Sequence, residues 1–167
     1  MKNKIIEGQL TFSFTEPNAT KYDEWSFYRN QFNAVCGGTK AVDLLYLEQQ
    51  NFWLIEIKDY RQHTRTKTID LADEIALKVR DTLAGLVAAQ VNANEQIERD
   101  FAKEALKKKR IRVVLHLEQP IHTSRLFPRA INPADVKPIA KNVPRYKIKL
   151  LNGLIFDPTR VEYPHNN

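Results

Sequence analysis

The stretch that decides the fold runs from Ala41 to Lys58 and reads AVDLLYLEQQNFWLIEIK. Its first part, Ala41 to Glu48, is mostly apolar and is followed by the polar residues Gln-Gln-Asn. Its second part, Phe52 to Lys58, alternates between apolar and polar residues at its end. This pattern predicts two strands joined by a short turn. Strands joined in this way pair antiparallel, so we expect a hairpin within a sheet.

Three charged residues interrupt this apolar hairpin, namely Asp43, Glu56 and Lys58. Alternation along a strand puts Glu56 and Lys58 on one face, and antiparallel pairing can bring Asp43 beside them. Two carboxylates can bind a hard cation such as Mg²⁺ or Mn²⁺ through oxygen. The alternative is an exposed hairpin face with a weak Glu–Lys pair. An Asp is disfavoured in an apolar strand, which favours the functional interpretation.

The spacing of these three residues resembles the signature of the PD-(D/E)xK nuclease superfamily, an acidic residue followed across a hairpin by Asp/Glu-x-Lys. The resemblance covers about Lys21 to Leu117, although Val42 stands where the family has its name-giving proline. It implies a restriction-endonuclease-like core and a magnesium-dependent hydrolase. Asp43 and Glu56 would bind the metal, and Lys58 would orient the attacking water.

The same resemblance implies a further catalytic acid from the helix that precedes the hairpin. Glu24 is the candidate, because it lies in the first turn of that helix, and Asp23 is its alternative. The alternative explanation is equally good, since an acidic residue in a first turn complements the helix dipole.

The elements around the hairpin predict an α/β fold. The apolar spacing predicts helices at Tyr22–Asn33, Asp70–Asn92 (with Asp70 as N-cap) and Glu95–Lys109, and a strand at Ile111–Leu117. A strand, a long helical connection and another strand imply a right-handed crossover, so the last strand should lie parallel. The expected core is therefore a helix, an antiparallel hairpin, a helix and a strand, in a mixed sheet flanked by helices.

The two ends of the chain are less regular. Residues Gln9 to Phe14 predict an N-terminal strand or arm. Beyond Pro120 we expect a short helix at 134–141 and a closing hairpin of 147–151 with 154–156. We interpret the chain as one domain, 1–167, with an arm at 1–20, a core at 21–117 and a C-terminal extension at 118–167.

The charge of the chain suits a polyanionic partner. Lys and Arg number 26 against 20 Asp and Glu, a net charge of +6. The loop after the hairpin carries Arg61, Arg65 and Lys67, residue types that bind nucleic-acid phosphates without reading sequence; the alternative is a solvated loop. A second basic cluster ends the second long helix, where cations commonly balance the dipole, and comprises Lys103, Lys107, Lys108, Lys109, Arg110 and Arg112.

Composition also sets limits on location and chemistry. The start of the chain has no apolar signal segment, and the longest apolar stretch, Leu83 to Ala89, is too short to span a bilayer. A single cysteine, Cys36, excludes an intrachain disulfide and fits a reducing compartment. We therefore expect a cytoplasmic protein. No glycine-rich phosphate loop is present, which argues against an NTP-driven motor.

The sequence thus predicts a metal-dependent endonuclease-like phosphodiesterase acting on nucleic acid. DNA is the expected substrate, with RNA left open, and a homodimer is possible because duplex cleavage often needs two sites. The alternative is a non-catalytic nucleic-acid- or protein-binding module of the same fold. Such modules lose the acid or the lysine, whereas this chain keeps all three residues.

Overall fold

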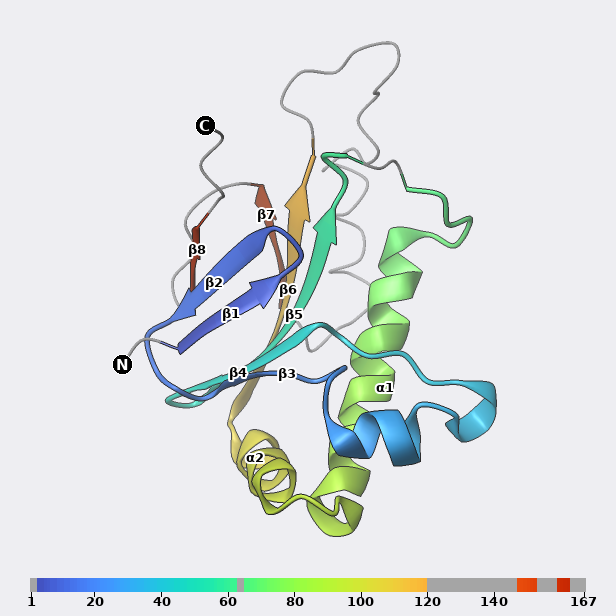
Figure 1. The fold of residues 1–167 in the computed structure, drawn as a ribbon, viewed down its shortest axis with the longest axis vertical. Helices are drawn as coiled ribbons and strands as arrows, with labels where there is room; N and C mark the ends of the chain where they lie inside the picture. Colours follow the sequence, from blue (N-terminus) through green and yellow to red (C-terminus); the bar gives the residue numbers. More distant parts are fainter. Residues whose placement is uncertain (1–2, 63–64, 120–146, 153–158, 163–167) are drawn as a thin grey trace.

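Two β-sheets organise the computed structural model, which describes residues 3–62, 65–119, 147–152 and 159–162 (Figure 1). The larger sheet has the strand order β3-β4-β5-β6-β7, and the smaller has the order β1-β2-β8. The strands are β1 (Asn3–Glu7), β2 (Leu10–Phe14), β3 (Ala19–Lys21), β4 (Leu44–Glu48), β5 (Asn51–Asp59), β6 (Arg110–Glu118), β7 (Lys147–Asn152) and β8 (Thr159–Glu162). The helical segments are η1 (Tyr28–Phe32), η2 (Val35–Gly37), α1 (Leu71–Asn92) and α2 (Gln96–Lys107).

The central hairpin and the crossover are confirmed. Strands β4 and β5 pair antiparallel, with Leu44 opposite Ile55, and turn at Gln49, which has a positive φ of 44°. Strand β6 pairs parallel with β5 after the two helices, so the sheet is mixed. Asp70 is the N-cap of α1, because its side chain accepts the Ala72 N–H at 2.7 Å. The predicted α/β class is therefore confirmed.

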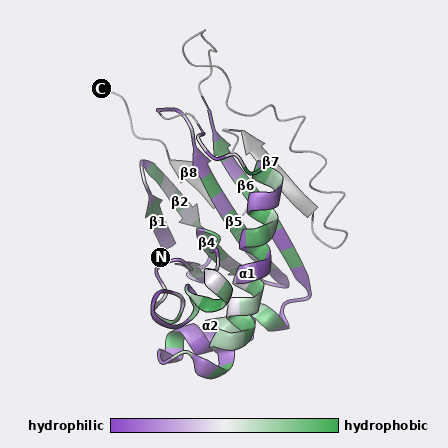
Figure 2. Cartoon of the chain, turned by 90° about the vertical axis from the view of Figure 1, so that its right-hand side faces the viewer, coloured by the Kyte–Doolittle hydropathy of each residue, from purple (hydrophilic) through white to green (hydrophobic). Residues whose placement is uncertain are grey.

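Both faces of the larger sheet are covered, which explains why β6 is apolar along most of its length. On one face, α1 and α2 pack against residues such as Leu54 and Leu115. On the other face, the β1–β2 hairpin packs Phe12 and Phe14 against Tyr46. In Figure 2, α1 carries both hydrophobic and hydrophilic residues along its length. No helix within the described part of the chain is long and apolar enough to cross a membrane.

The helix predicted at Tyr22–Asn33 is wrong as a continuous α-helix. The helical part begins at Ser26 and becomes a π-helix, η1. Its start is fixed from outside, because the Glu98 carboxylate on α2 accepts the N–H groups of Ser26 at 2.7 Å and Phe27 at 3.0 Å. This cap comes from a residue distant in sequence, so the local apolar spacing could not place the helix start.

Both ends of the chain differ in part from the prediction. The expected arm is a hairpin, because Gly8, at φ 57°, lets β1 fold back on β2. Strand β7 is present where the first arm of the closing hairpin was predicted, and it lies parallel to β6. Strand β8 pairs with β2 in the other sheet. The predicted helix at 134–141 and the predicted strand at 154–156 lie outside the described residues.

Candidate functional site

The segment that precedes β4 is fixed to α1 by hydrogen bonds. The backbone N–H of Lys40 donates to Asp81 Oδ2 at 3.0 Å, and that of Val42 donates to Thr82 Oγ1 at 3.1 Å. Asp43 follows as a bend residue directly before β4, and not within the strand as the apolar run predicted. Its polar side chain is thus placed at the end of the sheet, next to α1.

The structure brings Asp43, Glu56 and Lys58 together around a fourth residue, Lys78 on α1. Lys78 Nζ lies 2.6 Å from Glu56 Oε1 and 3.5 Å from Asp43 Oδ1. Lys58 Nζ lies 2.7 Å from the same Glu56 oxygen. Asp43 Oδ2 accepts the Ile57 backbone N–H at 2.6 Å. The two carboxylates therefore share one ammonium group.

The network continues into the first turn of α1. Lys58 Nζ lies 3.0 Å from Glu74 Oε1, which also contacts Lys67 Nζ at 2.6 Å. Arg65 Nη2 lies 3.2 Å from Glu74 Oε2. We refer to Asp43, Glu56, Lys58, Glu74 and Lys78 as the ion cluster. Its acidic and basic groups alternate, so each buried charge has a neighbour of opposite sign.

Burial and neighbouring charges shift the pKa values of the two buried glutamates of the ion cluster, Glu56 and Glu74, in opposite directions. Glu56 is fully buried, and burial together with the negative charge of Asp43 raises its pKa to about 7, although Lys78 and Lys58 oppose the rise. Burial alone would raise the pKa of Glu74, but hydrogen bonds from Lys67 and Lys58 outweigh it and lower that pKa to about 2. Glu74 is therefore ionised at pH 7, whereas Glu56 titrates near neutrality.

Asp23, and not Glu24, is the acid that lies near Asp43 of the ion cluster. The Tyr22 N–H donates to the Asp43 carbonyl at 3.2 Å, which places Asp23 beside Asp43. The pKa of Asp23 is raised by burial and by the charge of Asp43. Glu24 instead pairs with Lys21 at 3.2 Å, and its side chain is 51% exposed. The structure thus leaves Glu24 outside the predicted site.

The donor set fits a divalent cation only in part. Glu56 Oε2 is buried and has no hydrogen-bond partner among the described residues, as expected of a metal ligand. No group of three or more His, Cys, Asp or Glu in the described part of the chain is arranged to hold a metal. The Lys78 ammonium lies between the two predicted ligands, so a cation there would compete with it.

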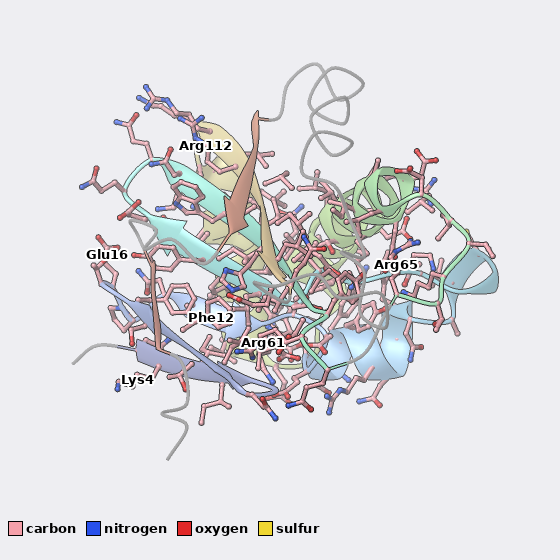
Figure 3. All side chains as sticks on the ribbon, turned by 90° about the horizontal axis from the view of Figure 1, so that it is seen from above. Lys4, Phe12, Glu16, Arg61, Arg65 and Arg112 are labelled. Carbon is pink, nitrogen blue, oxygen red and sulfur yellow. The ribbon has the colours of Figure 1, made fainter. Side chains whose placement is uncertain are left out.

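The basic loop forms a wall of the ion cluster. Arg61 binds Asp59 through Nε at 2.9 Å and Nη2 at 2.6 Å. Arg65 donates to the carbonyls of Lys67 and Ile69 in addition to its contact with Glu74. Figure 3 shows Arg65 on the side of the molecule away from Arg112, and Arg61 below the middle of the view. These loop cations thus have internal partners, and phosphate binding by Arg61, Arg65 and Lys67 stays a prediction.

Sequence reasoning missed Glu74 and Lys78, although a signal was present. They lie four residues apart on α1, with Thr82 four residues further, and all three face the sheet with the apolar residues of the helix. Charged residues inside an apolar helical stripe need partners of opposite sign, because unpaired buried charge is costly. That spacing, matched with Glu56 and Lys58, could have indicated the cluster.

The chain is similar to a cysteine–tRNA ligase from Neisseria meningitidis serogroup A. The two are 37% identical over an alignment of 163 residues, which covers 79% of this chain and 23% of the ligase. The chain thus spans about a quarter of the length of this curated relative. No family model matches the chain, and no solved structure matches it either.

This similarity overturns the functional prediction made from the short motif. The relative is a ligase, not a PD-(D/E)xK nuclease, so the nuclease assignment and the expected hydrolysis of DNA are wrong. The similarity gives no support to the alternative of a non-catalytic module of that fold. A restriction-endonuclease-like core has no support beyond the confirmed α/β class. The physical reason is that an acid and Glu-x-Lys recur by chance, and here they build a mutually neutralised cluster.

Proposed function

We propose that this chain acts in tRNA aminoacylation, as the counterpart of one segment of a cysteine–tRNA ligase, and that it contacts tRNA there. The observation that carries this proposal is the 37% identity over 79% of the chain. Similarity of that extent rests on many positions, whereas the nuclease motif rested on three. In this proposal the chain belongs to a ligase machinery, and its nucleic-acid partner is RNA.

The turn between α2 and β6 is the surface best suited to RNA phosphates. Lys107, Lys109 and Arg110 are exposed there, at the end of a helix and the start of a strand. Arg112 lies next on β6, opposite the half-buried Trp53 of β5. Cations that neutralise phosphates beside an aromatic ring that can stack on a base are typical of RNA-binding surfaces. This basic turn supports the proposal better than the internally paired loop does.

Removing three charges from the basic turn should weaken tRNA binding at least tenfold. The variant is Lys107→Ala/Lys109→Ala/Arg110→Ala, and the measurement is fluorescence anisotropy with labelled tRNA at several salt concentrations. Each lost phosphate contact should lower the log–log salt slope by up to about 0.9. The matched control, Lys4→Ala/Arg29→Ala/Lys40→Ala, removes the same charge elsewhere and should bind as the wild type. Equal slopes in both variants, or no tRNA binding at low salt, would contradict the proposal.

We also propose that Asp43 and Glu56 bind Mg²⁺ or Mn²⁺ in competition with Lys78. The buried, unpartnered Glu56 Oε2 supports this. A bound divalent cation would supply positive charge for a phosphate of the RNA.

Mn²⁺ binding, followed by electron paramagnetic resonance, should increase about tenfold in affinity in Lys78→Met, because the competing ammonium is removed. It should be lost in Glu56→Gln, and it should strengthen above pH 7, where Glu56 is ionised. Glu24→Gln is the control, since Glu24 lies outside the ion cluster. Mn²⁺ affinity that is unchanged in Glu56→Gln would remove this residue from any metal site.

A further inference from the structure

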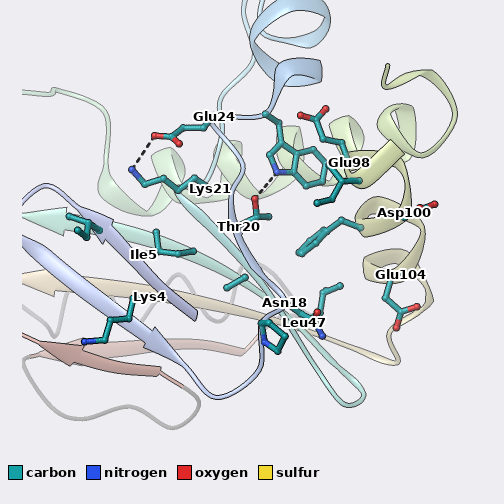
Figure 4. Close-up of a pocket in the computed structure, with 16 residues that line it drawn as sticks. Lys4, Ile5, Asn18, Thr20, Lys21, Glu24, Leu47, Glu98, Asp100 and Glu104 are labelled. Atoms are coloured by element: carbon teal, nitrogen blue, oxygen red, sulfur yellow. Dashed lines mark hydrogen bonds and ion pairs between the residues drawn. The ribbon is translucent and has the colours of Figure 1, made fainter. Parts of the chain in front are cut away.

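An open groove of about 920 Å³ lies between β1, β3 and α2 (Figure 4). It is lined by residues from four parts of the sequence: 4–6, 17–25, Leu47 and 97–104. None of the residues that line it belongs to the ion cluster or to the basic turn. The groove is therefore a separate feature of the molecule.

The floor of the groove is apolar and aromatic. Trp25 and Phe101 pack edge to face with ring centroids 5.5 Å apart, and Leu47 lies beside them. Two large side chains at the rim stay in solvent, Ile6 at 65% and Ile97 at 79% exposure. Exposed isoleucines at the edge of an apolar groove favour a partner that covers them.

The lining of the groove is acidic, because it carries the carboxylates of Glu24, Glu98, Asp100 and Glu104 against the ammonium groups of Lys4 and Lys21. This contrasts with the net +6 of the chain. Lys21 is shared between two carboxylates, Glu7 at 2.7 Å and Glu24 at 3.2 Å, which leaves one negative charge in excess. Asp100 accepts a hydrogen bond from the neutral Gln96 at 2.7 Å and forms no ion pair with any residue that the structure describes. Glu104 adds a further carboxylate, which is paired with Lys108 at 2.8 Å. An acidic rim repels nucleic acid and attracts cations.

We propose that this groove binds a basic, amphipathic peptide segment of a protein partner. Apolar side chains of that segment would cover Ile6 and Ile97 and contact Phe101. Its Lys or Arg residues would pair with Glu24 and Asp100, as complementary charge at an interface requires. A helix laid with its apolar face in a groove is a common mode of peptide recognition. This proposal is independent of tRNA contact, because the two surfaces have opposite charge.

The test uses a synthetic helical peptide with leucines on one face and lysines on the other. The chain has two tryptophans, so each gives one assignable indole N–H signal in a ¹H–¹⁵N spectrum. The Trp25 indole N–H donates to Thr20 Oγ1 at 3.0 Å beside the groove, and should shift on titration while the Trp53 signal stays in place. Ile97→Ala should weaken binding at least fivefold without loss of stability, because that side chain is mostly in solvent.

Charge variants distinguish binding of the peptide in the groove from nonspecific electrostatic attraction to the protein. Glu24→Gln/Asp100→Asn should bind the lysine peptide at least tenfold more weakly. The matched control, Asp73→Asn/Glu95→Gln, removes the same charge from exposed positions that do not line the groove and should bind normally. A peptide with glutamate in place of lysine should not bind. Equal binding of both peptides, equal loss in both variants, a shift of Trp53 alone or no binding would each overturn the proposal.

Discussion

Replacing Glu56 with Gln is expected to raise the free energy of unfolding by about 3 kcal/mol at pH 8. Glu56 is fully buried, and its pKa in the folded protein is raised from 4.5 to about 7. Each pKa unit corresponds to roughly 1.4 kcal/mol, so the rise represents about 3 kcal/mol of unfavourable ionisation. An amide of the same volume does not ionise and avoids this cost.

The stability difference between the wild type and Glu56→Gln should depend on pH. Between pH 4.5 and about pH 7 the folded wild type keeps a proton that the unfolded chain releases, so its stability falls as the pH rises. Glu56→Gln should lack this fall, and the two proteins should differ least near pH 4.5. Urea unfolding at pH 5 and pH 8 measures both values.

Glu74→Gln is the matched control, because its pKa is shifted in the opposite direction. A carboxylate with a pKa lowered to about 2 stabilises the fold above pH 4.5, and that contribution is lost as the pH falls towards 2. Glu74→Gln should therefore destabilise the protein at pH 7, because Lys67 and Arg65 lose the carboxylate that they contact and Lys58 keeps only Glu56. If Glu56→Gln were destabilising to the same degree at pH 8, the ion pairs of Glu56 would outweigh its burial.

The regular elements were predictable because their apolar spacing is local. The β4–β5 hairpin and α1 appear close to their predicted bounds, since alternation and a 3.6-residue stripe each need only neighbouring residues. The start of η1 was not predictable, because its cap, Glu98, lies about 70 residues away in sequence. The pairing of β7 and β8 with different sheets is likewise a property of the tertiary fold.

The ion cluster was likewise predictable only in part from local sequence. The proximity of Asp43, Glu56 and Lys58 could be predicted from strand pairing, because all three lie in one hairpin or directly next to it. Lys78 and Glu74 come from a helix whose rotation against the sheet is fixed by packing, so their place in the cluster required the fold. Convergence of charged side chains did not identify the function. The three-residue pattern predicted a nuclease, whereas most of the chain is similar to part of a cysteine–tRNA ligase.

Replacing Gly85 with Ala is expected to destabilise the fold by about 2 kcal/mol, although Ala is the better helix former. In an exposed helix this change gains about 1 kcal/mol. Here a Cβ at position 85 would lie 2.0 Å from Tyr22 Oη and 3.0 Å from the Phe32 ring. Tyr22 is fully buried and cannot swing into solvent, so α1 would have to move away from the segment that contains η1. Thermal and urea unfolding measure the loss.

A second substitution, Tyr22→Phe, should restore part of the stability that is lost in Gly85→Ala. Tyr22 Oη is buried and has no hydrogen-bond partner among the described residues, so Tyr22→Phe alone should be close to neutral. In the double variant Tyr22→Phe/Gly85→Ala the closest clash is gone, and at least half of the lost stability should return, a coupling that a double-mutant cycle quantifies. The neighbouring exposed Ala84→Gly serves as the control for helix propensity and should cost about 1 kcal/mol regardless of Tyr22. Additive effects of the two substitutions would show that Tyr22 and Gly85 are not in contact, and would contradict the packing of α1 described above.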